Sequence, residues 1–98
     1  MTNENNTFLI KDNIGEPAVY EQLAEECTEL AKQALKMARY LRGENPTPCT
    51  KDVILDNLTE EFTDVMLCSC ELGLHADYAI FLRKHQRWRQ RINDRKQK

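Results

Sequence analysis

The sequence has few of the residues that interrupt helices, with three glycines and three prolines among 98 residues. Because these two residue types supply most turns and breaks, their scarcity predicts a small number of long elements. No run of 18 consecutive apolar residues occurs, and the N-terminal segment 1–7 is polar. We therefore expect neither a membrane span nor a signal peptide, and no membrane partner.

The four cysteines do not form a metal-binding motif. No Cys-x-x-Cys pair occurs, and Cys68 and Cys70 are two residues apart in a segment expected to be helical, so they point in different directions. This pattern argues against a zinc site and favours reduced thiols that serve as small apolar residues. Reduced thiols are typical of the cytoplasm, which is the expected location.

The size and composition fit one small folded domain. A hydrophobic content of 41% with 31% charged residues is typical of a globular helical domain and not of a disordered chain. A chain this short hides only a modest fraction of its surface. We therefore expect self-association, as a homodimer or a homotetramer, to complete the core.

Three helices are predicted, and no segment has the pattern of a strand. Residues 18–42 contain no glycine or proline and are rich in strong helix formers. A second helix is expected from a cap at Thr50 or Asp52 to about Leu72, and a third from about Tyr78 to Asp94. The predicted fold is therefore all-α, with two long antiparallel helices and a basic C-terminal helix that complete a four-helix-type bundle by oligomerisation.

The expected organisation is an N-terminal arm at 1–15, one helical domain at 16–95 and a frayed tail at 96–98. Apolar residues recur at helical spacing in each helix, and we expect these stripes to pack in the core. In the second helix the stripe comprises Ile54, Leu58, Phe62, Val65, Ser69 and Leu72. In the third helix it comprises Tyr78, Phe81, Leu82, His85, Trp88 and Ile92.

Two copies of one acidic pattern stand in the first two helices. Glu26 and Glu29 are three residues apart, and so are Glu61 and Asp64. Residues at this spacing lie on neighbouring parts of one helix face. If the two helices pack together, the four carboxylates converge and repel each other, an arrangement that a bound cation stabilises.

Both acidic pairs have the same phase relative to the apolar stripes of their helices. If Glu26 is set at 0° on a helical wheel, Glu29 falls at about −60° and the apolar stripe falls between about +20° and +60°. Glu61 and Asp64 take the same two angles on the second helix. Each helix therefore places one acid at the edge of its buried stripe and the other just beside it.

The surroundings of Glu61 favour a metal site over ordinary surface acids. Glu61 stands between Leu58 and Val65, where an apolar residue is expected, and no Lys or Arg follows Asp52 in that helix. An unpaired charge at such a position is costly. Oxygen ligands without His or Cys favour a hard cation, Mg²⁺ or Mn²⁺ as a substitute. Neither histidine follows a Glu by three residues, which argues against a di-iron site.

The third helix supplies charge of the opposite sign. Residues 83–98 hold eight basic residues and one acidic residue, whereas residues 1–82 hold six basic and 15 acidic residues. Lys84, Arg87 and Arg91 form a basic line beside the apolar stripe and are candidates for binding phosphate. A solvated face, or salt bridges to the acidic helices, is the alternative role of this line.

The sequence resembles the MazG-like nucleotide pyrophosphohydrolases over about residues 16–95. The resemblance rests on Glu-Glu-x-x-Glu-Leu at 25–30, Glu-Glu-x-x-Asp-Val at 60–65 and Lys-x-x-Arg-Trp-x-x-Arg at 84–91. It implies that Glu26, Glu29, Glu61 and Asp64 bind Mg²⁺, and that nucleoside triphosphates are hydrolysed to the monophosphate and pyrophosphate. It also implies a dimer or a dimer of dimers.

Several questions stay open at this level. Either Glu26 or Glu29 is a candidate for the catalytic base, and the base-binding residues are unknown. The alternatives to a general enzyme are a specialised dUTP, dCTP or phosphoribosyl-ATP-type pyrophosphatase, and a non-catalytic interaction module that uses the basic C-terminal helix. Nucleic acid is not expected as a partner. The segment 43–49 looks long for a compact family member and leaves the substrate class open.

Overall fold

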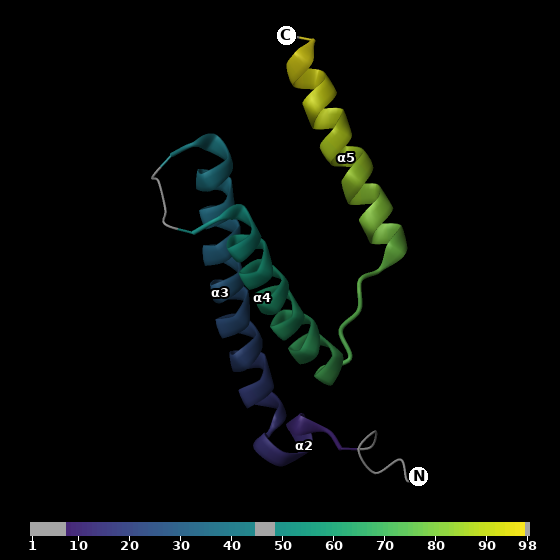
Figure 1. Ribbon diagram of the computed structural model, residues 1–98. Helices are drawn as coiled ribbons and strands as arrows, with labels where there is room; N and C mark the ends of the chain where they lie inside the picture. The colour runs from purple at the N-terminus through teal and green to yellow at the C-terminus, as the bar shows by residue number, and fades with distance from the viewer. Residues whose placement is uncertain (1–7, 45–48, 98) are drawn as a thin grey trace, which may run out of the picture.

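The computed structural model describes residues 8–44 and 49–97, and every regular element within them is helical. The chain forms a short helix α2 (Ile10–Ile14), two long helices α3 (Glu16–Arg42) and α4 (Lys51–Glu71), and a separate helix α5 (Tyr78–Lys96). Figure 1 shows α3 and α4 side by side and α5 apart from both. The all-α prediction is confirmed.

Local sequence signals place the ends of the long helices. Gly43 ends α3 in the left-handed conformation (φ 72°), which glycine adopts without the steric penalty of a Cβ. At the start of α4 the Thr50 hydroxyl accepts a hydrogen bond from the Val53 N–H at 3.3 Å. Asp77 caps α5 in the same way, with its carboxylate accepting from the Ile80 N–H at 3.0 Å. These caps explain why the predicted boundaries agree closely with the structure.

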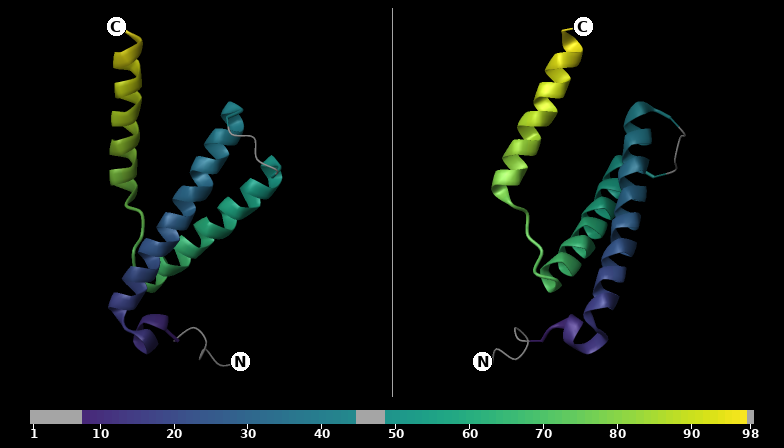
Figure 2. Two further views of the ribbon diagram at one scale, coloured as in Figure 1. Left: turned by 90° about the vertical axis from the view of Figure 1, so that its left-hand side faces the viewer. Right: turned by 180° about the vertical axis from the view of Figure 1, so that it is seen from behind.

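Helices α3 and α4 form the packed part of the molecule. They run antiparallel and lie side by side in all three views (Figures 1 and 2). Their small core contains Val19 from α3 and Ile54 and Cys68 from α4, with Ile54 fully buried. The predicted antiparallel pair is therefore present.

The segment before α3 is more ordered than the predicted arm. Residues 10–14 form helix α2, which packs on the start of α3. The Lys11 backbone N–H donates to the Glu71 carboxylate at 3.2 Å, and this bond ties α2 to the end of α4. Gly15, with a φ of 91°, separates α2 from α3. The rest of the predicted arm, at 1–7, lies outside the described residues.

The prediction that the apolar stripe of the third helix packs in the core is wrong for a single chain. Helix α5 buries none of its residues. Tyr78, Phe81 and Trp88 are 73%, 59% and 64% exposed. The stripe exists as a pattern along α5, but α5 stands apart from α3 and α4 in every view (Figures 1 and 2). Helix α5 also continues to Lys96, past the predicted end at Asp94.

One member of the stripe predicted for α4 is also misplaced. Phe62 is 56% exposed, whereas Ile54 and Cys68 face α3 and are buried. Phe62 lies about 100° around the helix from Glu61, which is outside the part of the α4 surface that packs against α3. None of the described helices is both long and apolar enough to cross a bilayer.

Candidate metal centre

Three of the four predicted carboxylates meet between α3 and α4. Glu26 comes from α3, Glu61 and Asp64 come from α4, and each is half-buried. One carboxylate oxygen from each residue lies within 4.8 Å of the other two. The antiparallel packing of α3 on α4 brings the middle of one helix against the middle of the other, and this places the two acidic motifs opposite each other. We call this group the carboxylate cluster.

The fourth predicted ligand, Glu29, lies beside the carboxylate cluster and not in it. Its side chain is exposed and forms an ion pair with Lys32 at 3.3 Å. Its charge nevertheless acts on Glu61, because it is one of the groups that raise the pKa of that residue. Glu29 is thus close enough to influence the cluster while its carboxylate points to a partner one turn further along α3.

Glu61 has a raised pKa, as expected for a carboxylate that lies among other negative charges. Desolvation raises the pKa of Glu61, and the charges of Asp64, Glu26 and Glu29 raise it further. No described basic side chain forms a salt bridge with Glu61, Asp64 or Glu26. A cation in the cluster would offset this repulsion.

Gln22 is a site residue that sequence analysis missed. Its Nε2 donates to Glu26 Oε1 at 2.8 Å, which fixes the orientation of the Glu26 carboxylate. The signal was available, because Gln22 stands four residues before Glu26 and therefore shares its helix face. A neutral amide at this spacing is less conspicuous than a charge, but it orients a carboxylate without neutralising it.

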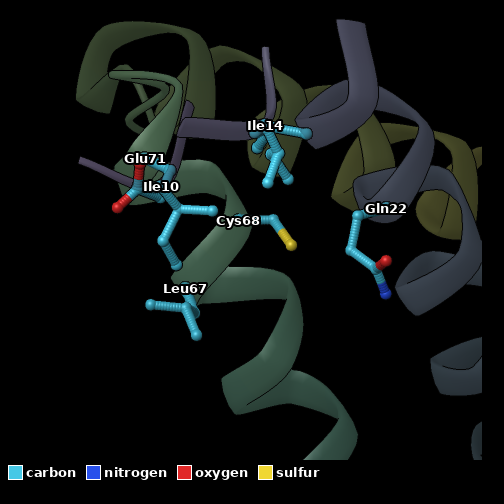
Figure 3. Close-up of a pocket in the computed structure, with 7 residues that line it drawn as sticks. Ile10, Ile14, Gln22, Leu67, Cys68 and Glu71 are labelled. Atoms are coloured by element: carbon cyan, nitrogen blue, oxygen red, sulfur yellow. The ribbon is translucent and has the colours of Figure 1, made fainter. Parts of the chain in front are cut away.

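An apolar cavity of about 120 Å³ lies between α2, the first part of α3 and the end of α4 (Figure 3). Gln22 and Cys68 line it, together with residues from α2 and from the end of α4. Burial raises the pKa of the Cys68 thiol, and the charges of Glu26 and Asp64 raise it further. Cys68 therefore lines the cavity and is also close enough to Glu26 and Asp64 for their charges to act on its thiol. This cavity could not be predicted from the sequence, because the helical fold of residues 10–14 was not.

The structure does not bring the predicted phosphate-binding residues to the cluster within one chain. Lys84, Arg87 and Arg91 are exposed on α5. Their spacing gives the expected line along one side of the helix. However, α5 stands away from α3 and α4 (Figure 2). The acidic and basic parts of the predicted site are therefore separate in a single chain.

The donor set of the cluster suits a hard divalent cation. Three carboxylate oxygens converge from two rigid helices, and the cluster contains no sulfur or imidazole ligand. Mg²⁺ prefers such oxygen ligands and usually completes its coordination with waters and substrate phosphates. Three protein oxygens leave room for those additional ligands.

Comparison with known proteins adds no relative: no protein-family model, curated protein or solved structure matches this chain.

Proposed function

We propose that this protein is a Mg²⁺-dependent nucleoside triphosphate pyrophosphohydrolase that removes unwanted nucleotides from the cellular pool. The observation that carries the proposal is the meeting of Glu26, Glu61 and Asp64 from two matched acidic motifs. Like charges at this separation are unfavourable in a metal-free protein, as the raised pKa of Glu61 indicates. The resemblance of the motifs to MazG-like enzymes supports the same reaction.

In this proposal Glu26, Glu61 and Asp64 hold Mg²⁺, or Mn²⁺ as a substitute. The bound cation would offset the negative charge that develops on the phosphate oxygens. Gln22 donates a 2.8 Å hydrogen bond to Oε1 of Glu26 and so holds one oxygen of this carboxylate. Lys84, Arg87 and Arg91 bind the remaining phosphate oxygens once α5 is in place.

Glu29 is our choice of general base. It stands next to the cluster, and its exposed carboxylate is not one of the three converging ligands. It is therefore available to accept a proton from a water molecule as that water attacks the α-phosphorus. The bond between the α-phosphorus and the bridging oxygen breaks, and the electron pair leaves with pyrophosphate. Positioning and charge stabilisation supply most of the catalysis in such reactions.

A substrate panel tests the proposal. The purified chain is incubated with Mg²⁺ and individual ribo- and deoxyribonucleoside triphosphates, including dUTP and dCTP, and with phosphoribosyl-ATP. We expect pyrophosphate and the monophosphate in equal amounts from at least one substrate, and no product in the presence of EDTA. A specialised pyrophosphatase would act on a single member of the panel. Release of inorganic phosphate, or no cleavage of any member, would overturn the proposal.

The exposure of α5 favours a second candidate function, that of a non-catalytic helical interaction module. Helix α5 is basic and buries none of its residues, so an acidic partner is the chemistry it would bind. Binding of this kind weakens steeply with salt. Salt-sensitive capture of an acidic partner without Mg²⁺-dependent hydrolysis would favour this role over the enzyme.

A further inference from the structure

Helix α5 presents aromatic rings that no described part of the chain covers (Figure 2). Tyr78, Phe81 and Trp88 are exposed, and so is His85 between them. The rings of Tyr78 and Phe81 are nearly parallel, with 6.4 Å between their centroids and 8° between their planes. Phe81 and His85 repeat this arrangement at 6.4 Å and 4°. A row of parallel, exposed rings suits a partner that has flat aromatic groups of its own.

The basic line runs along α5 directly beside these rings. At 100° per residue, the four rings fall within a sector of about 80° around the helix. Lys84, Arg87 and Arg91 fall in the adjoining sector, and Arg95 continues the line by one turn. The other flank of the rings carries amide side chains, at Gln86, Gln90 and Asn93. The cations therefore lie on one side of the rings, as the phosphates of a single nucleic acid strand lie on one side of its bases.

One surface pocket combines rings and positive charge. It has a volume of about 320 Å³ and is lined by Phe81, Lys84, His85 and Trp88. Helix α5 as a whole contains seven basic residues and one acidic residue, a net charge of +6. Among the described residues, none of these cations takes part in an ion pair. Helix α5 therefore offers aromatic faces and uncompensated charge to the same ligand.

We propose that α5 binds single-stranded nucleic acid, with bases stacked on Phe81, His85 and Trp88 and phosphates bound by the basic line. Proteins that bind single strands combine aromatic side chains, on which successive bases stack, with cations that follow the backbone. Rings and cations both recur along α5 at intervals of three or four residues, so the two rows stay side by side. Four cations match about four phosphates, which is at the lower end of the site sizes of such proteins.

A lipid surface fits α5 less well than a nucleic acid strand. A helix that lies on a membrane buries its apolar face at the boundary between headgroups and acyl chains. Arg89 falls between Tyr78 and Leu82 on the helical wheel, which is inside that face. Burial of its charge there is costly. Bases stacked on the rings leave Arg89 in water or against a phosphate.

This inference goes beyond the proposed function and does not rest on it. The basic line binds substrate phosphates once α5 is in place, whereas a nucleic acid strand would occupy it while α5 stands free. The sequence did not lead us to expect nucleic acid as a partner, because it placed the rings in the core, where no base can stack on them. The carboxylate cluster takes no part in this binding, so Glu61→Gln should bind the strand as the wild type does.

The fluorescence of Trp88, the one tryptophan of the chain, reports stacking directly. The wild-type chain is titrated at low salt with oligo(dT) and oligo(U) of about 12 nucleotides. We expect saturable quenching by both, because the proposed contacts involve bases and phosphates, which DNA and RNA share. Anisotropy of a labelled oligonucleotide should show binding to Trp88→Leu that is about fivefold weaker or more. Gln86→Ala, on the other flank of the rings, should bind as the wild type does.

Salt dependence measures the phosphate contacts. For single strands, the slope of log K against log salt is about −0.7 for each phosphate contacted, so four cations predict about −2.8. Replacement of Arg87 and Arg91 with Gln should reduce the slope to about −1.4.

Absence of saturable binding to the wild type, or equal binding to the wild type and Trp88→Leu, would overturn the proposal. So would phosphatidylserine vesicles that shift the fluorescence of Trp88 when oligonucleotides do not, because a lipid surface would then cover the rings. An oligomer that binds no oligonucleotide and that Trp88→Leu dissociates would overturn it in favour of a second copy of the chain. Oligonucleotide binding by a chain that hydrolyses no nucleotide would refute the proposed function alone.

Discussion

Glu26 of α3 and Glu61 of α4 present carboxylate oxygens within 4.8 Å of each other, and Asp64 completes the group at the same separation. Glu26 is oriented by Gln22, whereas Glu61 is held where desolvation and neighbouring charges raise its pKa. The packing of α3 on α4 therefore keeps together acids that would separate if they were free to do so. A bound cation would offset the repulsion between these acids.

Glu29 and the cluster are expected to respond differently to mutation. Glu29→Gln should lower turnover by roughly 100-fold or more, because it removes the proposed general base. It should weaken Mn²⁺ binding by less than about threefold, because Glu29 is not one of the three converging ligands and solvent screens the charge of its exposed carboxylate. Single-turnover rates and Mn²⁺ titration measure the two effects. Equal losses in rate and affinity would instead make Glu29 a metal ligand.

The metal-free protein should become more stable on mild acidification through Glu61. Its pKa is raised in the folded state from the ordinary value of 4.5. The folded state therefore binds the proton more tightly, and stability rises as the pH falls through the raised pKa toward 4.5. The melting temperature of wild type minus that of Glu61→Gln isolates this effect. We expect the difference to grow more negative as the pH rises from 4.5 toward 7, and a constant difference would contradict the prediction.

Ile54 should be the most sensitive core position. It is fully buried in a core that includes few other residues, so Ile54→Ala removes packing that nothing replaces. Such truncations cost about 2–5 kcal/mol. The adjacent control Val53→Ala changes a side chain that is 45% exposed and should cost less than about 1 kcal/mol. Urea unfolding measures both, and equal effects would contradict the packing described for α4.

Cys68 should be protected from alkylation. It is buried, and desolvation raises the pKa of its thiol, so the reactive thiolate is scarce near neutral pH. Cys27 and Cys70 are exposed. Iodoacetamide followed by peptide mass spectrometry should label these two first. Comparable labelling of Cys68 would show that α3 and α4 open readily.

The sequence was informative where short-range chemistry decides the structure. Gly43, Thr50 and Asp77 end or begin helices as predicted, because caps act on backbone groups within one turn. The shared phase of the acidic motifs predicted that all four acids would converge. Carboxylate oxygens of Glu26, Glu61 and Asp64 do meet, whereas Glu29 lies beside them and pairs with Lys32. The three meet because the same helical phase fixes both the apolar contact and the acids beside it.

The sequence was less informative where the burial of a helix face depends on which other surface packs against it. The predicted apolar stripe is present along α5, but periodicity does not say which surface covers a helix face or whether that surface belongs to the same chain. Phe62 was assigned to the wrong side of α4 for a related reason, since α4 is apolar on two sides. Helix α2 was missed because a five-residue helix has too few residues to show a period.

The most direct test of the carboxylate cluster compares Glu61→Gln with its neighbour Glu60→Gln. Both changes remove one negative charge from the same turn of α4, but only Glu61 belongs to the cluster. Titration with Mn²⁺ should show binding to wild type and to Glu60→Gln with similar affinity. Binding to Glu61→Gln should be at least about tenfold weaker, with the fold retained. Equal affinity in all three proteins, or no binding to wild type, would contradict a metal site at Glu26, Glu61 and Asp64.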